Sequence, residues 1–104
     1  MKLRSLILSR QAYASLADIG EWTVLNFGAQ QAKRYTDQLV AQCKAIVRGR
    51  AVSQSCRTMF ADDLAADLRF TRAGQHFVIF VEAPDEVLIV DFLHQSADIA
   101  GRLT

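Results

Sequence analysis

The stretch "QHFVIFVEAPDEVLIVDFLH", residues 75–94, decides the fold of this chain. It contains two apolar runs, 75–82 and 86–94, each of the length and composition that predict a strand. The residues between them, Ala83-Pro84-Asp85, are a turn signal. A connection this short predicts that the two strands are antiparallel neighbours in one sheet.

Two further runs extend this predicted sheet. The run "LAADLRFTR", residues 64–72, precedes a turn signal at Ala73-Gly74 and completes a three-stranded antiparallel meander. The run "KLRSLIL", residues 2–8, is short and apolar and has no helix start, so it predicts a strand that joins the same sheet. Residues 49–63 show no period and predict a loop, and the tail 95–104 predicts one helical turn or coil.

Two helices lie between the first strand and the meander. Ser9 occupies an N-cap position, and apolar residues then recur at steps of three and four, which predicts an amphipathic helix over residues 10–26. A second periodic stretch follows Gly28 at once and predicts a helix over Ala29–Arg48, ended by Gly49. Because the link is so short, the two helices are expected to form an antiparallel hairpin.

The predicted order is strand, helix, helix and three strands, which is an α+β fold with a helical hairpin on one face of a single sheet. A chain of 104 residues predicts one domain, residues 1–104. Its net charge of +1 provides no overall field that would attract nucleic acid or an anionic membrane, so neither is an expected partner. The N-terminal apolar stretch is too short for a signal peptide, and no window is long enough to span a membrane, so a cytoplasmic location is expected.

The sequence predicts neither a metal nor a cofactor. Cys43 and Cys56 are far apart and no histidine pair lies near them, whereas a zinc site needs four ligands at tight spacings. Both thiols are therefore predicted to be reduced. The five glycines are scattered turn and cap residues that form no phosphate-binding loop.

Over nearly its whole length the sequence resembles the ParE/RelE superfamily of small bacterial toxins, and the ParE branch in particular. Five features carry the resemblance, in this order: "LILSRQAYASLADIGEWTVLNFG" (6–28), "QAKRYTDQL" (31–39), a loop with cysteine and arginine, "DLRFTRAGQHFVIF" (67–80) and "VLIVDFLHQSADIAGRL" (87–103). The last is the most specific, because an apolar strand ends in Leu-His, an Asp follows four residues later and Arg-Leu closes the segment.

The resemblance implies a toxin that is held inactive in a hetero-oligomer by a cognate, ParD-like ribbon-helix-helix antitoxin. The ParE branch resembles inhibitors of DNA gyrase, and the RelE branch resembles ribosome-dependent nucleases that cleave messenger RNA. The phosphate-binding lysines of the nuclease pattern fall on Ala65 and Asp67, and an expected arginine falls on His76. The C-terminal arginine falls near Ala97 and the tyrosine near Leu103.

An aspartate in place of a phosphate-binding lysine repels an RNA substrate, so the sequence predicts a gyrase inhibitor that is not an enzyme. His76 is expected to be exposed beside its turn, and a backbone carbonyl is expected to satisfy a ring nitrogen of His94. A ribonuclease built on His76 and His94, and a degenerate toxin that keeps only antitoxin binding, remain as alternatives.

Asp91 interrupts the last apolar run. Strict alternation along that strand places Asp91 with Val87 and Ile89, at the point where their face leaves the core. Two interpretations remain open: a rim position paired with Arg69 or Arg72, and a solvated edge-strand charge that blocks aggregation.

The predicted partner surface combines three features. The strand 75–82 is apolar on both faces, so Phe80 is a candidate contact if an antitoxin covers the face away from the helices, although the loop 49–63 is an alternative cover. The aromatic residues at the hairpin turn either lock the hairpin or bind a partner, and the arginines suit an acidic antitoxin. The full predicted set is Trp22, Phe27, Tyr35, Arg69, Arg72, Phe80, Asp91 and His94.

Overall fold

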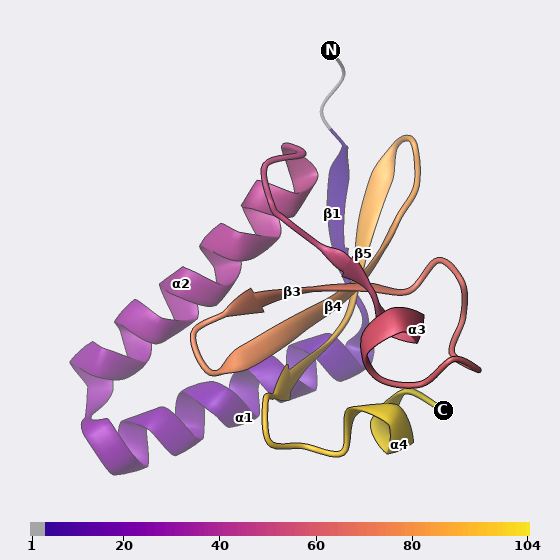
Figure 1. The fold of residues 1–104 in the computed structure, drawn as a ribbon. Coiled ribbons are helices and arrows are strands. Elements are labelled where there is room, and N and C mark those ends of the chain that lie inside the picture. Colours follow the sequence, from indigo (N-terminus) through magenta and orange to yellow (C-terminus); the bar gives the residue numbers. More distant parts are fainter. Residues whose placement is uncertain (1–3) are drawn as a thin grey trace.

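The computed structural model describes residues 4–104 and has the predicted α+β architecture (Figure 1). The elements, in chain order, are β1 (Ser5–Leu8), α1 (Arg10–Phe27), α2 (Ala29–Val47), β2 (Gln54–Ser55), α3 (Cys56–Met59), β3 (Arg69–Ala73), β4 (His76–Glu82), β5 (Glu86–His94) and α4 (Ile99–Leu103). The helical hairpin lies on one side of the sheet, and α3 and α4 lie on the other (Figure 1).

The sheet has five strands in the order β1-β5-β4-β3-β2. The predicted antiparallel meander of β3, β4 and β5 is confirmed, and β1 joins it by pairing in parallel with β5. Residues 2 and 3 of the predicted first strand lie outside the described residues. Two predictions differ from the structure: residues 49–63 hold β2 and α3 rather than only a loop, and β3 begins at Arg69 rather than residue 64.

Ser9 connects the start of α1 to the sheet. Its hydroxyl oxygen accepts a hydrogen bond from the Ala12 amide at 2.9 Å, as an N-cap should, and the hydroxyl donates to the Val90 carbonyl at 2.7 Å. Gly28, at φ 90°, then ends α1 and allows α2 to start immediately. Within residues 4–104, neither this hairpin nor any other helix is long and apolar enough to cross a membrane.

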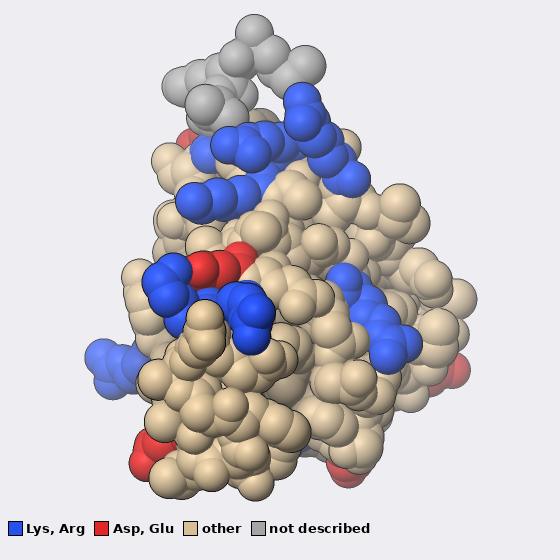
Figure 2. All heavy atoms as spheres, turned by 90° about the vertical axis from the view of Figure 1, so that its left-hand side faces the viewer, with Lys and Arg blue, Asp and Glu red and all other residues tan. Residues whose placement is uncertain are grey.

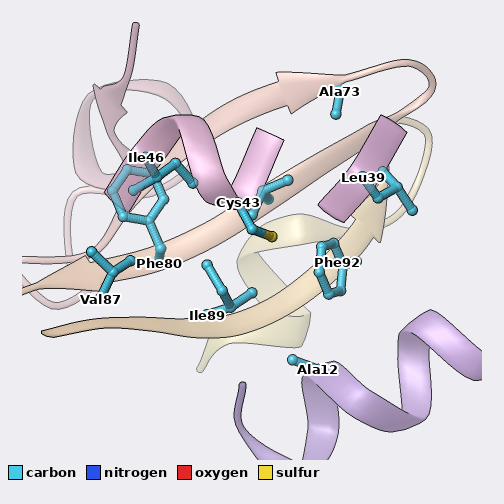
Figure 3. Packing of buried hydrophobic residues seen from close by; sticks show 10 residues of the cluster. Ala12, Leu39, Cys43, Ile46, Ala73, Phe80, Val87, Ile89 and Phe92 are labelled. Carbon is cyan, nitrogen blue, oxygen red and sulfur yellow. The ribbon is translucent and has the colours of Figure 1, made fainter. Parts of the chain in front are cut away.

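The helix face of the sheet carries the first core (Figure 3). Leu39, Cys43 and Ile46 of α2 pack on the sheet residues Phe80 and Ile89, and all five side chains are at most 2% exposed. Burying side chains of this size stabilises the fold by about 1.5–3 kcal/mol each. The 3.6-residue period of α2 is therefore what attaches the hairpin to the sheet.

The outer face of the sheet carries a second core, which the chain covers by itself. The segment 56–68 and α4 supply the cover, with Cys56, Leu64 and Ile99 at most 5% exposed. Within it Phe60, Phe70 and Phe77 form the outer aromatic cluster, with ring centroids 4.7, 5.5 and 5.3 Å apart. The prediction of an antitoxin on this face is therefore wrong, and its alternative, cover by the chain's own loop segment, describes the structure better.

A β-bulge between β4 and β5 explains the position of Asp91. Phe80 pairs with Ile89 but Ile79 pairs with Asp91, so β5 contains one extra residue at Val90. Strict alternation therefore fails after Ile89, and Phe92 joins the core under the helices.

Asp91 is 4% exposed. Its Oδ1 accepts from the Ser15 hydroxyl at 2.5 Å and from the Phe92 amide at 2.8 Å. Both interpretations from the sequence, the arginine-paired rim and the solvated edge, are wrong, because this carboxylate is buried between α1 and β5 and held by neutral donors. A buried carboxylate needs such donors, since without them its desolvation is costly.

Candidate functional site

A cleft of about 820 Å³ opens between the helical hairpin and the turn that joins β3 to β4. We call it the aromatic cleft. Residues from α1, α2, the turn and the facing ends of β4 and β5 line it. They are Asp18, Ile19, Trp22, Thr23, Phe27, Gln31, Tyr35, Gln38, Gly74, Gln75, His76 and His94. The volume lies within the range of sites that bind ligands or partner side chains.

Trp22 and Phe27 form the apolar wall of the cleft. Their rings meet edge to face with centroids 5.8 Å apart, yet they remain 59% and 64% exposed. Two large aromatic rings left this open beside a hollow are typical of a surface that another molecule covers. The hairpin itself is held by buried residues elsewhere, including Ala12 and Leu39.

Tyr35 joins α2 to the floor of the cleft. Its hydroxyl oxygen accepts from the Gln75 amide at 2.9 Å and lies 2.6 Å from Nδ1 of His76. The ring lies so close to Gly74 that a Cβ there would come within 2.6 Å of Tyr35 Cε1, and Gly74 also has a φ of 59°. Glycine is therefore required at this turn, because a side chain would clash with the Tyr35 ring.

His94 lies opposite His76 on the paired strand. The two residues are in register, and their rings meet edge to face with centroids 5.2 Å apart. Nδ1 of His94 accepts from the Ser96 amide at 3.0 Å and lies 2.7 Å from the Ser96 hydroxyl. The expectation of a backbone carbonyl as partner for His94 is thus wrong, since a backbone amide and a hydroxyl hold the ring instead.

The pKa values of His76 and Tyr35, on the floor of the cleft, are shifted from their ordinary values. The pKa of His76 is lowered to about 4, first because burial disfavours the charged ring and then because His94 repels it. Burial raises the pKa of Tyr35, while the Gln75 amide and the charge of Arg72 act in the opposite direction. His76 and Tyr35 are therefore both neutral near pH 7. The half-buried position of His76 also corrects the expectation that it would be exposed.

The structure brings four of the eight predicted contact residues together, namely Trp22, Phe27, Tyr35 and His94, all on the aromatic cleft. Arg72 is exposed at the rim, where its Nε donates to the carbonyl of Gly74 at 3.0 Å. Arg69 lies elsewhere, because its guanidinium donates to the Ser53 hydroxyl and carbonyl at 2.9 and 3.0 Å.

Phe80 and Asp91 are buried, at 1% and 4% exposed, and offer a partner no accessible surface in this structure. Phe80 faces the hairpin because it belongs to the core under α2 rather than to the outer face. The prediction that Phe80 and Asp91 contact a partner is therefore wrong, because both are interior residues.

Sequence reasoning missed His76, Gly74 and Asp18 as parts of the cleft. The signal for His76 in the sequence was only approximate. Counting residues outward from the Ala83–Asp85 turn pairs His76 with Leu93, one residue short of His94. The bulge supplies the missing residue and brings the two histidines opposite each other. Asp18 gave no signal, because its neighbours depend on the hairpin angle.

The described residues offer little for metal or thiol chemistry. Within residues 4–104, no three His, Cys, Asp or Glu side chains lie close enough to hold a metal ion. Cys43 and Cys56 are buried and free, and burial raises the pKa of each thiol to about 11. Thiols in such environments are poor nucleophiles near neutral pH.

Charge is unevenly distributed over the face of the hairpin. Figure 2 shows Lys and Arg side chains over the upper and middle parts of this face, while its lowest part, toward the hairpin turn, is mostly uncharged. The end of α2 and the loop after it carry the exposed cations Lys44, Arg48 and Arg50.

Comparisons with known proteins identify relatives over almost the whole chain. The family model for the "ParE toxin of type II toxin-antitoxin system, parDE" matches residues 6–99. Toxin ParE1 of Caulobacter vibrioides is 31% identical over 92% of this chain and 94% of that protein. Toxin ParE of Escherichia coli is 28% identical over 97% of this chain and 94% of that protein.

Solved structures share the fold. A chain of the chromosomal ParDE toxin–antitoxin system from P. aeruginosa matches with a TM-score of 0.69 and 19% identity, over 88% of this chain and 96% of that chain. The YoeB dimer from Staphylococcus aureus matches with a TM-score of 0.60 and 12% identity, over 88% of this chain and 97% of that chain. At these identities, the likeness concerns the fold alone.

Proposed function

Because the chain belongs to the ParE toxin family of type II toxin–antitoxin systems, we propose that it inhibits DNA gyrase by protein–protein contact and is neutralised by a cognate antitoxin. The match of the family model to residues 6–99 carries this proposal. We further propose that the protein is not an enzyme and that it acts in the cytoplasm.

The antitoxin is the proposed occupant of the aromatic cleft. Support comes from the rings of Trp22 and Phe27, which stand beside a hollow and which residues 4–104 leave more than half exposed. The proposed contact residues are Trp22, Phe27, Tyr35 and His94, with Arg72 at the rim. Arg69 stays in the proposed set as a contact outside the cleft, since its guanidinium is bonded to Ser53. A ParD-like ribbon-helix-helix protein is the proposed partner, in a hetero-oligomer.

The chemistry at the positions of the nuclease pattern also favours inhibition by contact. Ala65 and Asp67, where phosphate-binding lysines are expected, are exposed, and Asp67 would repel an RNA backbone. No cation stands at either position to stabilise the charge that develops on a phosphate during cleavage.

A ribosome-dependent ribonuclease is the second candidate, and one observation favours it. His76 and His94 meet at 5.2 Å in an open cleft, as a base and an acid for cleavage at a 2′-hydroxyl would have to do. A toxin that has lost activity and retains only antitoxin binding is the third.

The deciding experiment is induced expression in bacteria with DNA supercoiling and translation followed in parallel. Gyrase inhibition predicts loss of supercoiling or DNA breakage while translation continues. The His76→Ala and His94→Ala variants should still arrest growth if they fold, because neither ring performs chemistry in the proposed mechanism. An immediate stop of translation with cleaved messenger RNA, abolished in folded His76→Ala, would establish the ribonuclease instead. No effect on either process would identify the degenerate toxin.

A further inference from the structure

We propose that the floor of the aromatic cleft binds a carboxylate, supplied by an acidic side chain that the antitoxin carries beside an apolar one. The proposal rests on the proposed function only in naming the antitoxin as the source. It deepens that function by stating which chemical group the partner must bring to His76 and His94.

The hydrogen bonds of His94 fix which ring nitrogen carries its proton. The Ser96 amide can only donate, so Nδ1 of His94 must accept at 3.0 Å. A neutral ring that accepts at Nδ1 carries its proton at Nε2. His94 is exposed and lines the cleft, so this N–H is available as a donor there.

The same assignment follows for His76. The Tyr35 hydroxyl has one proton and two possible acceptors, Nδ1 of His76 at 2.6 Å and the Ala73 carbonyl at 3.4 Å. The shorter contact is the stronger hydrogen bond, so Nδ1 of His76 accepts from Tyr35 and Nε2 carries the proton. No partner within residues 4–104 is found for Nε2 of either ring. Since both residues line the cleft, these two N–H groups are the proposed donors to a ligand acceptor that replaces water.

This tautomer also argues against a metal ion. A metal binds the unprotonated nitrogen of a neutral imidazole. In both rings that nitrogen is Nδ1, which is already occupied by Ser96 or Tyr35. An oxygen acceptor fits the floor better than a cation.

The charges around the floor favour an anionic acceptor over a neutral one. Arg72 on β3 lies at the Gly74 side, and Arg102 on α4 lines the continuation of the cleft together with His76 and His94. Asp18 on α1 is the one acidic side chain among the residues that line these hollows, and it is exposed. Tyr35 on α2 is neutral near pH 7, since burial raises its pKa. Among the lining side chains Arg102 offsets Asp18, and Arg72, which lies outside the lining, adds a positive charge at the rim.

The apolar wall of the cleft indicates which groups of the ligand lie next to its carboxylate. Ile19, Trp22 and Phe27 line the same hollow as the two histidines, so a ligand that fills it offers apolar surface and an acid together. An aspartate or glutamate flanked by apolar side chains has this composition.

Proton linkage gives the proposal a signature that apolar docking lacks. His76 is neutral in the free protein at pH 6–7, because burial and His94 lower its pKa to about 4. An apolar ligand would bury the ring further and keep it neutral, so His76 would give the affinity no dependence on pH over this range. A carboxylate raises the pKa of His76, so binding takes up a proton and strengthens as the pH falls toward 5.

The test uses the whole chain and two small probes of the same shape, 3-phenylpropionate and 3-phenylpropanamide, titrated by NMR. The carboxylate is expected to bind roughly tenfold more tightly than the amide at pH 6, with shifts centred on Trp22 and His76. At pH 6 His76 is neutral, since its pKa is lowered to about 4, so this ratio reports the N–H donor, and proton uptake adds to it only as the pH falls further. Equal affinities, shifts located elsewhere, or no binding of either probe would overturn the proposal.

Two variants of His76 distinguish its role as a hydrogen-bond donor from its uptake of a proton. His76→Gln keeps an N–H near the position of Nε2 but does not titrate, so it should retain carboxylate binding and lose the pH dependence that His76 contributes. His76→Leu should lose about tenfold in affinity for 3-phenylpropionate and little for the amide. Leu25→Ala, which changes a side chain that is 78% exposed at the same end of α1 but outside the cleft lining, is the control and should change neither. If His76→Leu fails to fold, the comparison of the two probes on the unaltered chain still decides.

The titration with these two probes involves neither gyrase nor the antitoxin. Failure of the carboxylate site would therefore leave the gyrase proposal intact, and failure of gyrase inhibition would leave the carboxylate site intact.

Discussion

The outer aromatic cluster and the aromatic cleft use the same residue types with opposite results. Phe60, Phe70 and Phe77 meet within 5.5 Å and are covered by the segment 56–68 and α4. Trp22 and Phe27 meet at 5.8 Å but remain more than half exposed. The chain therefore uses its irregular segments to close the sheet and leaves the hairpin turn uncovered.

The contrast between the covered outer cluster and the exposed cleft indicates where apolar surface is available to a partner. The sequence pattern of β4, apolar on both faces, points to the sheet, yet that surface is already buried on both sides. The aromatic residues at the hairpin turn carry a weaker pattern but keep their surface. Apolar area serves a partner only where the chain's own loops do not reach it.

The largest expected effect breaks the outer cluster. Phe70→Ala removes a ring that is 6% exposed and contacts two other phenylalanines, so the free energy of unfolding should fall by about 3–5 kcal/mol. Urea titration followed by circular dichroism measures it. Trp22→Ala is the matched change in the cleft and should cost at most about 0.5 kcal/mol, because its ring is exposed. Similar losses for both variants would remove the distinction between the two regions.

The second effect concerns binding rather than stability. Trp22→Ala and Phe27→Ala should each weaken binding of the cognate antitoxin by about 2 kcal/mol, roughly 30-fold, as large aromatic contacts commonly do. Isothermal titration calorimetry measures the affinity. Leu25→Ala removes a side chain that is 78% exposed but does not line the cleft, so its affinity should be unchanged. If only Leu25→Ala weakens binding, the antitoxin uses another surface of the hairpin.

The smallest expected effect is a dependence of stability on pH that is specific to the cleft. Folding lowers the pKa of His76 from 6.5 to about 4, so the folded state favours the neutral ring. The stabilisation is complete above pH 6.5 and is lost as the pH falls from 6.5 toward 4, by about 1–2 kcal/mol after allowance for the half-exposed ring.

Unfolding of the unaltered chain and of His76→Gln at pH 7.5 and pH 4.5 measures this effect, since titrations common to both chains cancel. The unaltered chain should lose more stability than the variant on acidification. An equal loss in both would show that His76 titrates alike in the folded and unfolded states. Phe70→Ala should leave the difference unchanged, which keeps the effect assigned to the cleft.

Local signals in the sequence predicted most of the fold. Ser9 and Gly28 set the limits of α1, and the turns at Gly74 and Pro84 set the meander, because caps and turns depend on a few adjacent residues. The resemblance to the ParE family rested on the order of these same segments. The aromatic residues of the cleft were likewise visible, because they lie together around one turn.

Only the tertiary structure decided the remaining features. The bulge at Val90 turned Phe92 into the core, brought His76 opposite His94 and placed Asp91 beside Ser15. One inserted residue changes every later pairing, and nothing in the composition of β5 marks it. Which face of the sheet the segment 56–68 would cover depended on packing among residues distant in sequence. The sequence by itself determined the elements and their order, and packing decided which apolar surface remained exposed.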